Sequence, residues 1–178
     1  FKFKGNLLLQ NMFASALGIP VIMIIMPLFG LTSSLRLTNS RVLIIFLYTA
    51  VNVPFAVFYL LAFFKNLSFT YEEAAAIDGC PPMRTFWTIM FPLAQPGIIT
   101  VCIFNFITVW NEYFMSLIFA NKTSVRPVAV GLYNMISAMR YTGDWGGMFA
   151  SVVIVFLPTF ILYLFLSEKI IRGVTGGA

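Results

Sequence analysis

Residues Thr70–Gly97 read TYEEAAAIDGCPPMRTFWTIMFPLAQPG, and this stretch decides how the rest of the chain can fold. Two glutamates, one aspartate and one arginine lie between Thr70 and Arg84, whereas long uncharged runs flank the stretch on both sides. Charged side chains stay out of lipid because burying them there is costly. The sequence therefore predicts a polar hairpin of two short helices between membrane-spanning segments.

The first helix of this hairpin has recognisable start and stop signals. Thr70 and Glu73 have the spacing of a capping box, in which each side chain satisfies a backbone N–H at the helix start. Residues 74–76 are alanines, the strongest helix formers. Gly79 suits the left-handed backbone position that commonly ends a helix, so the helix is expected to end there.

The second helix is expected to begin at Pro82, because proline is favoured at the first position of a helix. Its apolar side chains recur with helical spacing at Met83, Phe86, Trp87 and Met90. Pro92 and Pro96 are expected to close it. Prolines bound the hairpin at both ends and are expected to stiffen it as hinge positions: Pro81, Pro82, Pro92 and Pro96.

The composition of the whole chain predicts a membrane protein. Of its 178 residues 60% are hydrophobic and 10% charged, against about 25% charged in a soluble domain. Four uncharged runs, 5–35, 42–64, 85–111 and 145–167, each reach the ~20 residues that a spanning helix needs. Because the runs are continuous rather than alternating, we predict an all-α, polytopic transmembrane helical bundle and not a barrel.

The chain is expected to form one transmembrane domain, 1–178, with the hairpin at 68–91 inside it. The predicted spans are Leu7–Leu31, Val42–Phe64, Pro96–Phe119 and Trp145–Ser167. Prolines at 20 and 27 suggest kinks in the first span. A weaker helix, Pro127–Met139, is expected to be interfacial or re-entrant, and Glu168–Ala178 to be a short basic tail with flexible glycines.

One acidic residue falls inside a predicted span. Glu112 lies two-thirds of the way along the third span, where a charge costs about 2.5–3.5 kcal/mol. It can therefore border a substrate pathway together with Trp110, Asn111 and the span residue Asn52. The alternative is that Glu112 lies near the far interface, with Trp110 and Tyr113 as belt aromatics.

The sequence does not contain the residue patterns that nucleic-acid binding, metal binding and ATP binding require. The net charge is +5, but the positive side chains are scattered singly, which does not indicate nucleic-acid binding. There is no histidine, and Cys80 and Cys102 do not have the spacing of a metal site. No phosphate-binding loop occurs, so the chain is not expected to bind ATP itself. We expect no catalytic residue, no metal and no cofactor.

The hairpin resembles the cytoplasmic EAA loop of ABC-importer permeases, and most closely that of the maltose-type sugar permeases. Their loop reads EAA-x-x-DG…F-x-x-I-x-x-P-x-x-x-P. The matching positions are Glu73, Ala74, Ala75, Asp78, Gly79, Phe86, Ile89, Pro92 and Pro96. The triplet WNE at 110–112 and GVTGGA at 173–178 extend the resemblance over nearly the whole chain.

The resemblance implies a permease subunit of an ATP-driven ABC importer in the bacterial inner membrane, most simply for a sugar or oligosaccharide. Its hairpin would couple to a separate cytoplasmic ATPase dimer through Glu73, Ala74, Ala75, Asp78, Gly79, Met83, Arg84, Phe86 and Trp87. The other implied partners are a second permease subunit in a hetero-dimer, an extracytoplasmic solute-binding protein, a small-molecule substrate and membrane lipid. Two earlier spans would precede Phe1. A permease for a non-sugar solute and a secondary transporter are the alternatives.

The orientation of the chain in the membrane follows from the resemblance more than from the distribution of its positive charges. Four spans put both chain ends and the hairpin on one side, which carries six of the eleven lysines and arginines, against five on the other. The excess barely favours a cytoplasmic hairpin.

Overall fold

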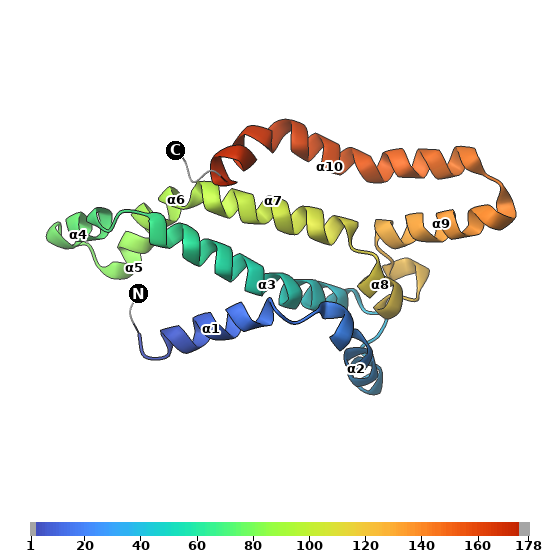
Figure 1. Cartoon of the computed structure of the whole chain (residues 1–178), viewed down its shortest axis with the longest axis horizontal. Coiled ribbons are helices and arrows are strands. Elements are labelled where there is room, and N and C mark those ends of the chain that lie inside the picture. Colours follow the sequence, from blue (N-terminus) through green and yellow to red (C-terminus); the bar gives the residue numbers. More distant parts are fainter. Residues whose placement is uncertain (1–2, 175–178) are drawn as a thin grey trace.

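The computed structural model describes residues 3–174, and all the regular structure within them is helical (Figure 1). In chain order the elements are α1 (Asn6–Ala16), α2 (Val21–Ser34), α3 (Arg41–Asn66), α4 (Thr70–Ile77), α5 (Pro82–Thr85), a π-helical turn (Phe86–Met90), α6 (Phe91–Leu93), α7 (Gln95–Asn111), α8 (Phe114–Phe119), a 3-10 turn (Thr123–Val125), α9 (Val128–Thr142) and α10 (Trp145–Val174). The predicted all-α fold is confirmed.

Two helices are long and apolar enough to cross a membrane by themselves, α3 and the part of α10 from Trp145 to Leu166. Two bent pairs raise the number of candidate spans to four: α1 with α2, and residues 82–93 with α7. The helix α10 continues to Val174, so the predicted short basic tail from Glu168 is helical up to that residue. Residues 175–178 of the C-terminal motif lie outside the described residues.

The first predicted span, Leu7–Leu31, is two helices rather than one. The axes of α1 and α2 differ by 97°. At the end of α1 the N–H groups of Leu17, Gly18 and Ile19 bond three residues back, which tightens the last turn. Pro20 follows and has no N–H to continue the helix, so it stands as the N-cap of α2.

The third predicted span, Pro96–Phe119, is also interrupted. Helix α7 ends at Asn111, Glu112 has an extended backbone, and α8 begins at Phe114. The prediction of one continuous helix is wrong because the Glu112 carboxylate accepts bonds from backbone N–H groups that a continuous helix would have used.

Pro92 does not close the second hairpin helix, contrary to the prediction. The chain passes through the π-helical turn, in which the N–H of Phe91 bonds to the carbonyl of Phe86. A wider turn before a proline reduces the clash of its ring with the preceding carbonyls. The break comes instead at Ala94, where the axis turns by 67° into α7.

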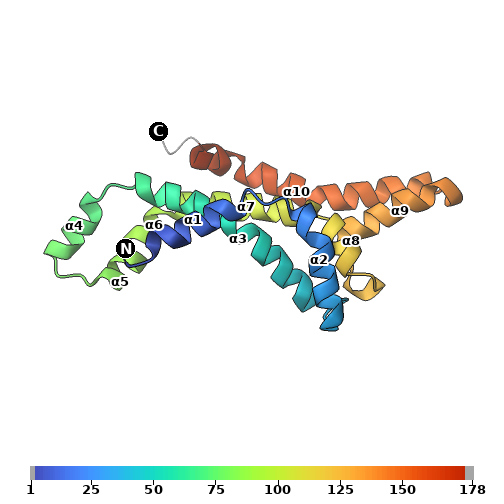
Figure 2. The ribbon, with the colours of Figure 1, turned by 60° about the horizontal axis from the view of Figure 1, so that its bottom comes forward.

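Helices α3 and α7 form the antiparallel centre of the molecule, and α1 and α10 pack on them (Figures 1 and 2). Three contacts define their register. From one end to the other these are Phe63 with Gly97, Phe55 with Phe104, and Tyr48 with Glu112. The hairpin, the start of α1 and the end of α10 lie at the same end of the molecule, as four spans require (Figure 1).

The end opposite the hairpin holds the main buried cluster, where α2, α3 and α8 meet. Its members are Ile25, Leu43, Ile44, Leu47, Met115, Phe119 and Ala120. Two loops cover this cluster and are joined by hydrogen bonds. The N–H of Asn39 bonds to the carbonyl of Phe119 at 2.9 Å, and its side-chain oxygen accepts the N–H of Lys122 at 2.8 Å. Arg41 donates to the carbonyl of Ser124 at 2.7 Å.

At Gly97 of α7 the Phe63 ring of α3 leaves no room for a side chain, and this yields the first testable prediction. A Cβ at this position would lie 2.6 Å from Cγ of the Phe63 ring. We expect Gly97→Ala to lower the free energy of unfolding by about 1–3 kcal/mol, the range for overpacked sites. Gly30→Ala in α2 is the matched control, because its Cβ would meet nothing within 4 Å. Equal thermal midpoints of the two variants in detergent would contradict the prediction.

Candidate functional site

The end of α4 has a defined backbone geometry. Gly79 has φ of 75°, which confirms the predicted left-handed position. Its N–H bonds to the carbonyl of Ala76 at 3.0 Å, and the N–H of Cys80 bonds to the carbonyl of Ala75 at 2.9 Å. These two bonds satisfy carbonyls that a helix end leaves free, as in a Schellman motif. A Cβ at Gly79 would meet nothing within 4 Å, so the constraint here is backbone conformation and not space.

The start of α4 differs from the predicted capping box. Phe69 is the N-cap, Thr70 is the first residue of the helix, and no side chain caps it. The hydroxyl of Thr70 pairs with that of Ser68 instead. Because α4 begins one residue earlier than a capping box requires, Thr70 and Glu73 do not exchange bonds with each other's backbone. Pro82 does open α5 at its first position, as predicted.

Part of the predicted coupling set holds the hairpin together from inside. Ala75 of α4 is buried, and its small side chain lets α4 lie close to the second half of the hairpin. Phe86 is half-buried, and its ring lies 6.1 Å from that of Phe64 at the end of α3 and 5.1 Å from that of Trp87. Ala75 is therefore covered within the hairpin, and Phe86 is only partly exposed.

The other predicted coupling residues are exposed, and one of them, Glu73, also lines a groove beside the hairpin. Glu73, Ala74, Asp78, Gly79, Met83, Arg84 and Trp87 are all exposed, with Met83 and Trp87 at 64% and 57%. Sequence reasoning missed Ile77, which is 86% exposed at the end of α4. The sequence did contain a signal for this exposure. Ile77 is the last residue before the Asp78–Gly79 turn, where the chain offers no packed surface for its side chain.

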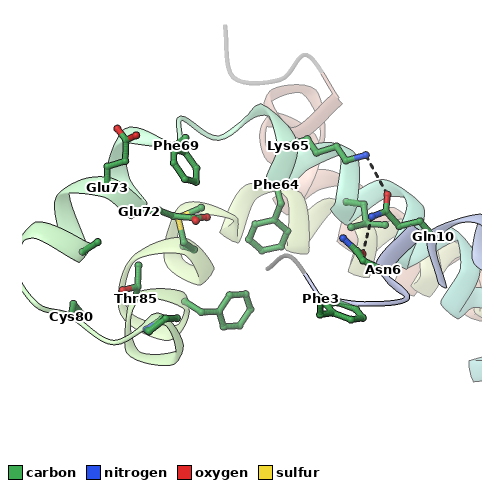
Figure 3. A pocket seen from close by; sticks show the side chains of 15 residues that line it. Phe3, Asn6, Gln10, Phe64, Lys65, Phe69, Glu72, Glu73, Cys80 and Thr85 are labelled. Carbon is green, nitrogen blue, oxygen red and sulfur yellow. Dashed lines mark hydrogen bonds between the residues drawn. The ribbon is translucent and has the colours of Figure 1, made fainter. Parts of the chain in front are cut away.

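A groove of about 650 Å³ separates the hairpin from the end of α3 and the start of α1 (Figure 3). Its walls combine aromatic side chains such as Phe3, Phe64 and Phe69 with polar and charged ones such as Glu72 and Glu73. In Figure 3 the carboxylate of Glu72 extends toward Phe64. One side of the groove is fixed because the ammonium of Lys65 donates to the side-chain oxygen of Gln10 at 3.4 Å, which links α3 to α1.

The predicted pathway residues do not gather at one point. Asn52 donates to the carbonyl of Tyr48 in its own helix at 2.8 Å, and Asn111 donates to that of Ile107 at 2.8 Å. The indole N–H of Trp110 donates to the carbonyl of Val155 at 2.9 Å and so links α7 to α10. The carboxylate of Glu112 accepts bonds from the backbone N–H groups of Met115 and Ser116 and from the hydroxyl of Tyr48.

Metal binding has no candidate site in the described part of the chain, where no three histidine, cysteine or acidic side chains come together. Cys80 and Cys102 are free thiols, as expected from their spacing.

The sequence of the chain matches a known protein family. Residues 1–175 match the model of a family described as "Binding-protein-dependent transport system inner membrane component". The chain belongs to this family. The family description is that of an inner membrane component of transport systems, and the apolar helices of this chain are suited by length and composition to a membrane.

Similar proteins carry the names of ABC permeases and sugar-uptake permeases. A putative ABC transporter permease protein, ORF2 of Caldicellulosiruptor sp., is 33% identical over all of this chain and 64% of its own length. The diacetylchitobiose uptake system permease protein NgcG of Streptomyces coelicolor is 32% identical over 99% of this chain and 59% of its own. The trehalose/maltose transport system permease protein MalG of Thermococcus litoralis is 30% identical, with shares of 99% and 63%.

These matches confirm the resemblance to carbohydrate-type ABC permeases that the hairpin sequence indicated. The chain spans about three fifths of the length of these relatives.

Proposed function

We propose that this permease is a membrane-spanning subunit of an ATP-driven ABC importer for a sugar or oligosaccharide. The family membership and the names of the relatives support the class of transporter and of solute. The observation that carries the proposal is the hairpin itself, which presents both charged and apolar side chains at one end of an otherwise apolar molecule. The sequence contains no phosphate-binding loop, so a partner would supply ATP hydrolysis.

The hairpin would dock on a cytoplasmic ABC ATPase dimer. Ile77, Met83 and Trp87 are exposed apolar side chains of the kind that carry most of an interface's free energy. Glu73, Asp78 and Arg84 lie on the same hairpin and would add polar contacts.

ATP binding would then shift the permease between inward-open and outward-open states, provided that the docked hairpin interacts differently with the ATPase in each. The inner contacts of Phe86 and the prolines at 81, 82, 92 and 96 would let the hairpin transmit this motion as one stiff body.

The remaining partners follow from the same assignment. A second permease subunit in a hetero-dimer and lipid would cover the exposed apolar side chains of α2 and α10. An extracytoplasmic solute-binding protein would approach the end of the molecule that holds the joined loops at Asn39 and Lys122. Asn52, Trp110 and Asn111 are pathway candidates, of which Asn111 is exposed.

Reconstitution tests the proposed function directly. The full-length permease, its partner permease and candidate ATPases would be placed in proteoliposomes with a purified solute-binding protein. We expect uptake of a labelled oligosaccharide that requires ATP on the side of the vesicle membrane where the ATPase is bound. This uptake should stop when the ATPase is omitted. Uptake driven by an ion gradient without ATP would assign the protein to secondary transport instead.

A further inference from the structure

The break between α7 and α8 is closed by a single carboxylate. One oxygen of Glu112 accepts the backbone N–H of Met115 at 2.6 Å, and the other accepts that of Ser116 at 3.3 Å. The second oxygen also accepts the hydroxyl of Tyr48 from α3 at 2.9 Å. The hydroxyls of Tyr48 and Ser116 pair with each other. Three segments therefore meet at one side chain.

The break needs such an acceptor. The first N–H groups of a helix have no carbonyl within the helix to bond to. Met115 and Ser116 are both buried, so water does not reach their N–H groups. Inside a membrane protein these groups must find a partner within the chain. Glu112, placed just before α8, provides that partner from its own side chain.

The protons of this cluster can be assigned. Backbone N–H groups only donate, so both oxygens of Glu112 act as acceptors toward α8. Tyr48 has one proton, which it gives to Glu112 at 2.9 Å. The hydroxyl of Ser116 must then donate to the Tyr48 oxygen. Every donor of the cluster has an acceptor.

The cluster also determines where α8 lies. Tyr48 stands on α3 at the last of the contacts that set the α3–α7 register, and α8 packs beside it in the buried cluster through Met115 and Phe119. The loop that follows α8 is joined to the α2–α3 loop through Asn39. Tilting α8 would therefore displace the joined loops at that end.

We propose that Glu112 is a positioning residue, which together with Tyr48 and Ser116 locks α8 to α3 and thereby sets the geometry of the end of the permease opposite the hairpin. Its carboxylate accepts hydrogen bonds from three donors of the chain, so it is not a group that binds the solute. For its transport readout this inference rests on the proposed function.

The test uses Glu112→Gln, Tyr48→Phe and the double variant in the complete transporter. Gln keeps one acceptor oxygen and loses the other, and Phe removes one hydroxyl and keeps the ring. We expect each single variant to lower the maximal uptake rate about tenfold, the factor for one lost hydrogen bond to a charged group. The KM for the solute should change less than about twofold, because a positioning residue does not contact it.

The double variant should be no more than about twofold slower than the slower single variant, because residues that act as one unit are not additive. The matched control is Tyr141→Phe, which removes the same hydroxyl from a side chain that is 90% exposed. A raised KM in Glu112→Gln with a normal Tyr48→Phe would overturn the proposal and return Glu112 to the pathway. The proposal would also be overturned if the rate losses of the two single variants multiplied in the double variant. Uptake rates of the single variants equal to that of Tyr141→Phe would overturn it as well.

A second measurement does not depend on transport. In the purified wild-type protein the amides of residues 114–118 should exchange slowly with deuterium, and Glu112→Gln should speed their exchange about tenfold. An unchanged exchange rate in Glu112→Gln would refute the proposed positioning of α8 by Glu112, even where the wild-type protein shows normal uptake. If the wild-type protein shows no ATP-driven uptake but this exchange result holds, the proposed function fails and the lock stands. If Glu112→Gln cannot be recovered from membranes, Tyr48→Phe decides by its rate and KM.

Discussion

Gly79→Val is expected to reduce ATP-driven uptake at least tenfold while the protein remains in the membrane. The φ of 75° at this position is left-handed, which costs an ordinary L-residue about 1–2 kcal/mol and a β-branched residue more. The chain would leave this conformation and lose the bonds from Gly79 and Cys80 to the last turn of α4. The angle between α4 and α5 would change, and with it the surface that meets the ATPase.

Gly79→Asn is the matched control for this experiment. Asparagine tolerates the left-handed region, and a Cβ at this position would meet no atom within 4 Å. We expect its uptake to stay within about threefold of wild type, since only a small conformational cost is added. Uptake by proteoliposomes and the amount of ATP hydrolysed per solute would be measured for both variants. Equal activity of Val and Asn would show that the hairpin angle does not matter for coupling.

Ile77→Ala is expected to weaken binding of the ATPase about 30-fold without changing stability. An apolar side chain that is 86% exposed contributes little to the fold, so its loss should leave the thermal midpoint of the permease unchanged. If Ile77 is a central anchor of the interface, its truncation costs about 2 kcal/mol or more. The dissociation constant of purified ATPase and permease in nanodiscs measures this effect. Trp87→Ala should act in the same direction.

The control for Ile77→Ala is Ile154→Ala. This isoleucine is also exposed, but it belongs to α10 and not to the hairpin. Its truncation removes the same atoms and should not change ATPase binding. If Ile77→Ala and Trp87→Ala both bind the ATPase like wild type, the outer surface of the hairpin is not the docking surface.

The hairpin was predicted well because its signals are local. The helix end at Gly79 and the helix start at Pro82 depend on backbone preferences of single residues, and both were confirmed. The predicted stripe Met83, Phe86, Trp87 and Met90 was less informative. Spacing groups these side chains on one face, but only the packing of α4 and the end of α3 separates exposed Met83 and Trp87 from half-buried Phe86 and buried Met90.

Glu112 shows why the interior of the spans could not be predicted from sequence. A charge inside an apolar run indicates either a pathway or an interface, and neither alternative included a helix break. The partner that defines its geometry, Tyr48, is 64 residues away in the sequence. No periodicity of α7 carries information about a hydroxyl on α3.

The sequence by itself determined that the chain is helical, with apolar runs of membrane-spanning length and an exposed charged hairpin, because composition, proline and glycine act locally on the chain. Only the tertiary structure decided where the long apolar runs bend, which hairpin side chains face outward and what Glu112 binds. Those outcomes depend on contacts between distant segments, such as Phe63 with Gly97 and Tyr48 with Glu112, and an apolar run has the same composition whether or not such a contact interrupts it.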